Sequence, residues 1–215
     1  EKGYTVHGIV RRKTLEDQTQ KLWRIQHMLN DITLHSSSLE SYEDILKIIQ
    51  LVEPDEIYHL AAQIYVQNSF VDEFSTLNIN ISGTHYILSA IKELRKKTKY
   101  YFAGSSEIFG KVKISPQNED TPFYPISPYG VSKVSGFCLT RIYREVYNLH
   151  ASSGILFNHE SPRRGGEYVS RKITQAVAKI KKGLQKDLYL GNIHARRDWG
   201  HAKDYVQAMW LILQQ

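Results

Sequence analysis

The sequence of 215 residues is poor in cysteine and contains no long apolar run. Its single cysteine, Cys138, cannot form an internal disulfide, which fits a reducing cytoplasm. No segment approaches the roughly 20 apolar residues that a membrane span needs, and no signal-peptide pattern opens the chain. We therefore expect a cytoplasmic protein without a membrane partner.

The sequence also lacks a basic segment interleaved with aromatic residues. The net charge is +6, but the basic residues are scattered, with short clusters such as "RRK" and "KIKK". Single-stranded nucleic acid would require a basic groove with stacking aromatics, so we expect no nucleic-acid partner. The positive charge points instead to anionic small molecules. No repeat or low-complexity tract is present, and we assign no metal ligands.

What the sequence does contain is an alternation of short apolar runs and longer helical ones. Strands are predicted at 4–10, 31–35, 56–62, 99–105 and 151–157. Helical periodicity covers 40–52, 72–97 and 129–149, and amphipathic helices are predicted in "SRKITQAVAKIKKGL" and "AKDYVQAMWLILQQ". This alternation predicts an α/β fold with a doubly wound parallel sheet.

A glycine-rich phosphate loop is missing from this pattern. A dinucleotide-binding fold begins with a strand, a G-x-G-x-x-G turn and a helix, and no such motif follows any predicted strand here. The opening "EKGYTVHGIVRR" is typical of the end of a helix and a second strand. We expect a Rossmann-type sheet without its first strand over residues 1–157, followed at 158–215 by the start of a smaller substrate-binding domain. Both would be incomplete, so the chain as given is expected to be inactive.

The segment "SPYGVSK" contains Tyr129 and Lys133, four positions apart on a predicted helix. About one Tyr-x-x-x-Lys is expected by chance, and a second, Tyr168 with Lys172, is present, so the spacing alone is weak. A lysine one helical turn away would favour the phenolate of a catalytic tyrosine. Near the end of the predicted strand 99–105, "AGSSEIFG" places Ser105 and Glu107 where ligands of α/β sheets bind. Serines that cap a turn beside a solvated glutamate explain the same residues.

These residues resemble the extended short-chain dehydrogenases. Three further stretches, "TPFYPISPYGVSK", "GILFNHESPRRG" with "RKIT", and "RDWGHAKDYV", are similar to the GDP-mannose 4,6-dehydratase family over nearly the whole chain. "NHESPRRG" is the most specific of them. The resemblance implies NADP-dependent conversion of GDP-mannose to GDP-4-keto-6-deoxymannose, a step toward deoxysugars such as GDP-fucose, by a homo-oligomer (dimer or tetramer).

The resemblance also implies the catalytic roles. Tyr129 would take the proton of the sugar O4 while C4 loses hydride, and Lys133 would hold the nicotinamide ribose and lower the pKa of Tyr129. Ser105 aligns with a threonine of the family that hydrogen-bonds O4. Glu107 would remove the C5 proton and help water leave from C6.

The implied binding residues fall into two sets. The cofactor set is Arg11, Arg12, Leu60, Ala61, Ala62, Gln63, Tyr129, Lys133, His159 and Arg164. The set that resembles contacts of the nucleotide diphosphate of the substrate is Asn158, Lys172 and Arg197. Arg11 and Arg12 end the second strand of the predicted fold, where an arginine accommodates the 2′-phosphate of NADP; a solvated basic turn is the alternative.

Some positions depart from the family pattern. Ser37 and Ser38 stand where the family has Gly/Ala-Asp, Ile64 replaces a serine, and Ser75 replaces a tyrosine on the cofactor side. Two alternatives therefore stay open: another nucleotide-sugar epimerase or reductase, and a non-catalytic fragment or pseudoenzyme of the family.

Overall fold

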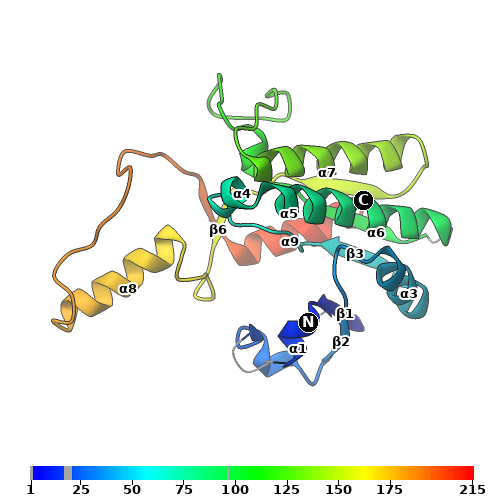
Figure 1. Cartoon of the computed structure of the whole chain (residues 1–215), viewed down its shortest axis with the longest axis horizontal. Helices are drawn as coiled ribbons and strands as arrows, with labels where there is room; N and C mark the ends of the chain where they lie inside the picture. The colour runs from blue at the N-terminus through cyan, green and yellow to red at the C-terminus, as the bar shows by residue number, and fades with distance from the viewer. Residues whose placement is uncertain (1, 17–20, 96) are drawn as a thin grey trace. The chain divides into compact units, whose positions relative to one another are not determined.

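The computed structural model describes residues 2–16, 21–95 and 97–215 (Figure 1). The chain is an α/β protein that divides into two compact units. The first consists of residues 1–155 with 212–215, and the second of residues 156–211. No helix in the described ranges is both long and apolar enough to cross a membrane.

The first unit alternates strands with helices along the chain. Its strands and helices are β1 (Val6–Val10), α1 (Arg12–Glu16), η1 (Gln26–Met28), β2 (Ile32–Ser36), α3 (Tyr42–Val52), β3 (Glu56–His59), α4 (Asn68–Val71), α5 (Glu73–Leu77), η2 (Asn78–Ser82), α6 (Gly83–Glu93), β4 (Lys99–Ala103), η3 (Ser106–Ile108), α7 (Pro128–Glu145) and β5 (Ala151–Gly154). The second unit contains β6 (Asn158–Glu160), α8 (Val169–Lys181), β7 (Trp199–His201) and most of α9 (Ala202–Leu213).

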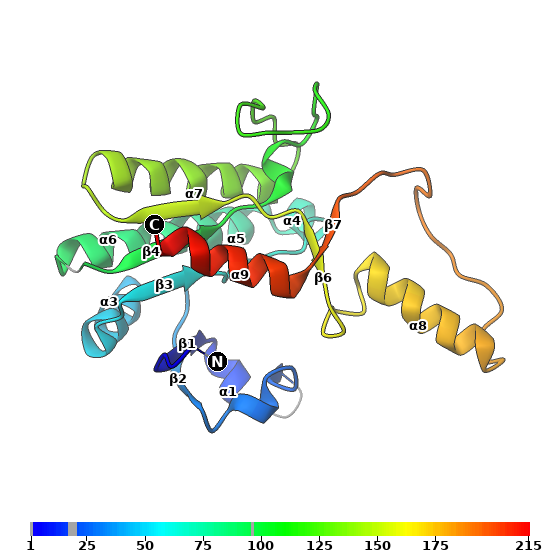
Figure 2. The same cartoon turned by 180° about the vertical axis from the view of Figure 1, so that it is seen from behind.

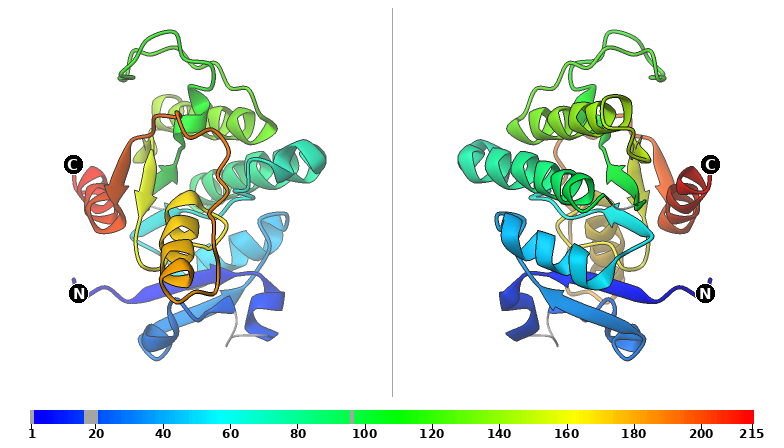
Figure 3. Two further views of the ribbon diagram at one scale, coloured as in Figure 1. Left: turned by 90° about the vertical axis from the view of Figure 1, so that its left-hand side faces the viewer. Right: turned by 90° about the vertical axis from the view of Figure 1, so that its right-hand side faces the viewer.

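All strand pairs in the described structure are parallel. β1 pairs with β2, β3–β4–β5 form a three-stranded sheet in that order, and β6 pairs with β7. Figure 3 shows β1 and β2 side by side in blue. The five predicted strands are confirmed; β1, β3, β4 and β5 are shorter than their predicted ranges, and β2 keeps the predicted length but begins one residue later. β6 and β7 were not predicted, because three residues are too few to show an alternating pattern.

The predicted helix over 72–97 is not continuous. Asp72 caps α5, its side chain accepting a hydrogen bond from the backbone N–H of Ser75. The π-helical segment η2 then separates α5 from α6, and α6 ends at Glu93. Residue 96 of the predicted range lies outside the described residues. α7 ends at Glu145, earlier than the predicted 149, and Asn148 takes a left-handed conformation with φ +54°.

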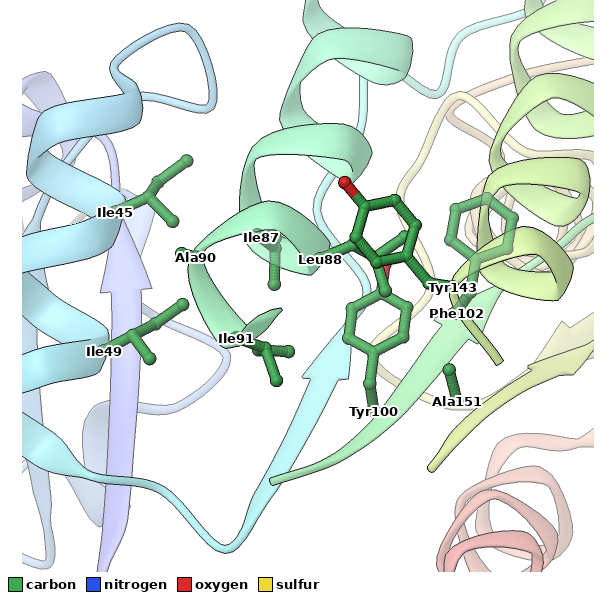
Figure 4. Packing of buried hydrophobic residues seen from close by; sticks show 10 residues of the cluster. All are labelled: Ile45, Ile49, Ile87, Leu88, Ala90, Ile91, Tyr100, Phe102, Tyr143 and Ala151. Atoms are coloured by element: carbon green, nitrogen blue, oxygen red, sulfur yellow. The ribbon is translucent and has the colours of Figure 1, made fainter. Parts of the chain in front are cut away.

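The hydrophobic core of the first unit surrounds β4. Tyr100, Tyr101, Phe102 and Ala103 are all buried, so this strand shows a continuous apolar run, as expected for a strand covered on both faces. Figure 4 shows side chains of α3, α6 and α7 gathered around β4 and β5. The cluster consists of Ile45, Ile49, Ile87, Leu88, Ala90, Ile91, Tyr100, Phe102, Tyr143 and Ala151. Burying each of its larger aliphatic side chains contributes roughly 1.5–3 kcal/mol.

The second unit is built on the short β6–β7 ladder. Asn158 pairs with Trp199, and Glu160 pairs with His201. α8 and the segment that follows it connect the two strands, and α9 begins directly after β7 (Figure 2). The two amphipathic helices predicted in this part of the chain are confirmed as α8 and α9.

Candidate functional site

Tyr129 lies in the first turn of α7, and local sequence places it there. The Ser127 side chain accepts a hydrogen bond from the Gly130 N–H at 3.0 Å, and Pro128 occupies the first helical position. A Cβ at Gly130 would lie 2.8 Å from the backbone oxygen of Glu107. The missing side chain therefore lets the start of α7 approach the η3 turn closely. Tyr129 is 8% exposed.

Lys133 follows one turn later on α7 and is also buried. Its Nζ donates a 2.8 Å hydrogen bond to the carbonyl of Ala103 at the end of β4, and lies 5.7 Å from the centre of the Tyr129 ring. Burial lowers the pKa of Lys133 to about 8. α7 reaches β4 this closely because Gly136 faces the Phe102 ring, where a Cβ would lie 2.2 Å from Phe102 Cζ.

Ser105 and Glu107 stand directly beyond the end of β4. Ser105 caps η3, its Oγ accepting from the Glu107 N–H at 3.3 Å, and both residues are half-buried. Parallel strands present ligand sites at their carboxyl ends. The structure therefore brings the Ser105–Glu107 turn and the Tyr129 end of α7 together, as the sequence predicted.

The segment Leu60–Gln63 follows β3, the neighbour of β4 in the sheet. Leu60 and Ala61 are exposed, whereas Ala62 and Gln63 are half-buried. His59, just before them, is buried and meets the hydroxyl of Thr84 at 3.2 Å. Burial, with a smaller contribution from the charge of Lys133, lowers the pKa of His59 to about 3. His59 is therefore neutral at pH 7 and adds no second positive charge beside Lys133.

Arg11 and Arg12 line a cleft of about 630 Å³ at the carboxyl ends of β1 and β2. The same cleft is lined by Lys13, Thr14, Lys21, Ser36, Ser37, Ser38 and Asp44. The lining thus contains four cationic side chains, one carboxylate and four hydroxyl groups. Arg12 also approaches Glu16 at 3.5 Å, an exposed pair of little energetic weight. The arrangement fits an anionic ligand with several oxygen acceptors.

Lys13, Thr14 and Lys21 were not singled out from the sequence. Lys21 is brought to the cleft because its Nζ donates to the Lys13 carbonyl at 2.8 Å. A surface lysine eight residues after Lys13 has no sequence signature that would reveal such a contact. Ser37 and Ser38 were noted only as departures from a family pattern, and the structure places both in the cleft wall.

Four of the predicted binding residues lie close to β6 and β7 in the second unit. The Asn158 side chain donates to the backbone carbonyl of Asp198 at 3.3 Å, next to Arg197 in the chain. The His159 ring packs on Tyr205 with centroids 5.1 Å apart. Arg164 forms a 3.2 Å ion pair with Glu160, and its guanidinium stacks 3.7 Å above the centre of the Tyr168 ring. Arg164 is thus held by groups of its own unit.

Lys172 lies on α8 and faces a different cleft. This cleft, of about 290 Å³, is lined by Lys172, Gln175, Ala176, Lys179, Gln185, Leu188 and Tyr189. Asn158 and Arg197 are not among the residues that line this cleft. Across the described ranges, no group of three or more His, Cys, Asp or Glu side chains is arranged to hold a metal ion.

Comparison with known sequences gives one consistent result. The family model described as GDP-mannose 4,6 dehydratase matches residues 1–215. The chain is 48% identical to the GDP-mannose 4,6-dehydratase of Vibrio cholerae, covering 100% of this chain and 59% of that protein. It is 46% identical to that of Drosophila melanogaster, covering 100% and 56%, and 48% identical to that of Cricetulus griseus, covering 100% and 59%. The chain thus spans less than two thirds of the length of these relatives.

Solved structures show a similar fold. RMD from Pseudomonas aeruginosa, complexed with NADPH, aligns with a TM-score of 0.81 at 25% identity, over 98% of this chain and 74% of that one. A UDP-glucose 4-epimerase from Thermotoga maritima, with UDP-glucose, aligns with a TM-score of 0.82 at 23% identity, over 97% and 65%. The second likeness concerns the fold alone.

Proposed function

Because the chain belongs to the GDP-mannose 4,6-dehydratase family, we propose that it takes part in the NADP-dependent dehydration of GDP-mannose to GDP-4-keto-6-deoxymannose. One observation carries the proposal. The start of α7, with a buried tyrosine and a buried lysine one turn later, packs against the Ser105–Glu107 turn at the carboxyl end of β4. The test is to detect the deoxysugar nucleotide after incubation with GDP-mannose and NADP⁺.

The residues of the first unit fit a phosphorylated dinucleotide. The cleft at Arg11 and Arg12 offers a clear excess of cationic side chains over carboxylates, which suits a 2′-phosphate better than a free ribose diol. Lys133 and the backbone of Leu60–Gln63 would hold the nicotinamide end. When bound, the dinucleotide supplies hydride chemistry, accepting hydride from C4 and returning it to C6 of the same sugar.

Two side chains near the carboxyl end of β4, Tyr129 and Glu107, would each carry out a different proton transfer. Tyr129 takes the proton from O4 as the C4–H bond breaks, and the Lys133 charge stabilises the phenolate that must be present beforehand. The Ser105 hydroxyl hydrogen-bonds the same sugar oxygen. Glu107 removes the C5 proton, which the C4 ketone makes acidic, and passes it to the C6 hydroxyl, which leaves as water. When hydride returns to C6, C5 takes up a proton, which balances the proton lost from O4. The sum is loss of one water molecule with no net change in the cofactor.

Replacing Glu107 by glutamine should separate these steps. Glutamine keeps the size of the side chain and removes its basicity, so oxidation at C4 should proceed while water loss falls by about 100-fold or more. Reduced-dinucleotide absorbance should rise on addition of GDP-mannose without formation of deoxysugar. Normal product formation by Glu107→Gln would contradict the role, and Glu119→Gln, in the exposed loop after η3, is the matched control.

The choice of cofactor should depend on Arg11 and Arg12. Replacing both by alanine removes two charge-assisted contacts to a 2′-phosphate, so NADP⁺ affinity should fall by about 100-fold. NAD⁺ affinity should change little, because NAD⁺ lacks that phosphate. Titration calorimetry with both dinucleotides measures the difference. The double variant Lys111→Ala with Lys113→Ala removes the same charge from an exposed loop and should leave both affinities unchanged. Equal losses for the two dinucleotides would favour the solvated basic turn.

We assign the nucleotide diphosphate of the substrate to residues 158–215. Asn158 and Arg197 are held near one another by the bond from Asn158 to Asp198, and Lys172 adds a cation on α8. Cationic side chains and amide donors suit a pyrophosphate. The predicted boundary at residue 157 thus separates the segment that would bind most of the dinucleotide from the segment that would bind the nucleotide diphosphate of the substrate.

We also propose that the protein assembles as a homo-oligomer. Large apolar side chains are exposed on α4, on α5, on α7 and at the C-terminal cap of α7, and these three helices contact one another in the first unit. They are Phe70, Val71, Phe74, Val131, Ile142 and Val146. Large exposed apolar patches mark protein–protein contacts, and a second copy of the chain would bury these side chains.

A further inference from the structure

Two histidines hydrogen-bond to each other on one face of the β1–β2 ladder. His7 lies in β1 and His35 in β2. In the parallel register His35 lies opposite Ile9, which stands on the same side of β1 as His7. His7 Nδ1 is 2.9 Å from His35 Nε2, and the two rings are inclined by 16° with centroids 5.2 Å apart. The strand pairing therefore brings one nitrogen of each ring against the other.

This histidine pair is open to solvent and lies outside the candidate site. His7 is exposed and His35 is half-buried. Neither is among the residues that line the cleft at Arg11 and Arg12. The two histidines are 28 positions apart in the chain, so their spacing carries no metal-site signature. The proposed dehydration uses neither imidazole, and the pair can serve a different ligand.

The separation of the two nitrogens suits a transition metal. Neutral imidazole is a common metal ligand. With metal–nitrogen bonds of about 2.0–2.1 Å, two nitrogens 2.9 Å apart subtend roughly 90° at a shared ion. That angle is found in the square-planar and tetragonal sites of Cu²⁺ and Ni²⁺. Tetrahedral Zn²⁺ would need the nitrogens about 3.3–3.4 Å apart.

A metal ion can replace the hydrogen bond without a net change in protons. In the neutral pair, one of the two facing nitrogens carries the proton that lies between them. When the ion takes both facing nitrogens, this proton moves through solvent to the outer nitrogen of the same ring. Each ring also turns so that its lone pair points at the ion, which the exposure of the pair permits. No oxidation or reduction accompanies binding.

We propose that His7 and His35 form a two-imidazole site for a divalent transition metal, which prefers Cu²⁺ and Ni²⁺ to Zn²⁺. Water fills the remaining coordination positions. The general order of affinities, in which Cu²⁺ exceeds both Ni²⁺ and Zn²⁺, acts in the same direction as the 90° geometry for Cu²⁺. Because the ion joins β1 to β2, it also stabilises this strand pair against opening.

Calorimetric titration of residues 1–215 with nickel chloride, in protein without a polyhistidine tag, tests the site. His7→Ala and His35→Ala should each weaken Ni²⁺ binding by at least about tenfold, because the second imidazole otherwise binds within the same molecule. Thr33→Ala alters the same strand face, and His194→Ala removes an exposed imidazole from the second unit. Neither control should change the affinity.

Three outcomes of the titrations would overturn the proposal. They are absence of Ni²⁺ binding, equal affinity in the wild type and both histidine variants, and tighter binding of Zn²⁺ than of Ni²⁺. Circular dichroism of each variant checks that the fold is retained. No titration requires a dinucleotide or a sugar nucleotide, so the metal site and the proposed dehydration can fail independently.

Amide hydrogen exchange of the unaltered protein provides a test that needs no variant. Ni²⁺ at about ten times its Kd should slow exchange within 6–10 and 32–36 by up to about tenfold, since the ion binds only when the two strands are paired. Mg²⁺ at the same concentration is the control and should leave the exchange unchanged, because it takes oxygen ligands. Unchanged exchange at both strands under saturating Ni²⁺ would refute a metal bridge between them.

Discussion

Tyr129→Phe should lower kcat for GDP-mannose dehydration by about 100-fold to 10,000-fold, the usual range for loss of a general base. The phenyl ring keeps the packing of a residue that is buried in the first turn of α7. Only the hydroxyl that exchanges a proton with O4 is lost. Product formation followed by NMR, with the fold checked by circular dichroism, measures the effect.

The chain supplies a matched control for this experiment. Tyr168 and Lys172 form the second Tyr-x-x-x-Lys pair, and the Tyr168 ring stacks under Arg164 through its face, which phenylalanine retains. Tyr168→Phe should therefore change kcat by no more than about twofold. A Tyr129→Phe enzyme with near-normal turnover would refute the assignment of Tyr129 as the base.

Lys133→Met should make the protein more stable while it abolishes turnover. Burial lowers the pKa of Lys133 from 10.5 to about 8, which corresponds to a cost of about 3 kcal/mol for holding the charge in the folded state. Methionine keeps the length and apolar stem. It loses the bond to the Ala103 carbonyl, worth about 1 kcal/mol, so the free energy of unfolding should rise by about 2 kcal/mol at pH 7.

The pH dependence of the stability gained by Lys133→Met tests whether the gain comes from removing a buried charge. Below pH 8 the lysine is protonated in both states, and the folded state bears the full cost of the buried charge. Between pH 8 and 10.5 the unfolded state binds more protons, so wild-type stability rises with pH relative to the variant. Urea denaturation at pH 7 and near pH 10 should therefore show the advantage of Lys133→Met shrinking. Destabilisation by Lys133→Met at pH 7 would contradict a desolvation cost at this position.

Local pattern was sufficient to predict the five strands of the first unit and the helix that carries Tyr129. The apolar run at 99–105 becomes the buried strand β4, and the Ser127–Pro128 start of α7 is a capping signal that sequence alone reveals. The break within 72–97 was not predicted, because a π-helical turn keeps an apolar pattern close to that of an α-helix.

The parts of the site that were missed depend on tertiary contacts. Asn80, a buried residue of η2, stands between two isoleucines in "NINIS" and carries no charge or nucleophile, so its spacing suggests no chemistry. In the structure its side chain hydrogen-bonds to Gln63 and Ser132, which are 17 and 52 residues away in the chain. Contacts across such separations leave no periodic trace in one sequence.

The weak burial of β1 and β2 has a consequence for the resistance of residues 1–215 to proteolysis. Val6 and Ile9 are 47% and 46% exposed, and no residue between 2 and 36 in the described ranges belongs to the core cluster around β4. Opening these two strands therefore costs less free energy than opening the core. A dinucleotide held by Arg11 and Arg12 would add about RT ln(1 + [L]/Kd) to that cost. Proteolysis at these strands would thus become slower as the concentration of cofactor rises. Proteolysis in the core around β4 would not depend on that concentration.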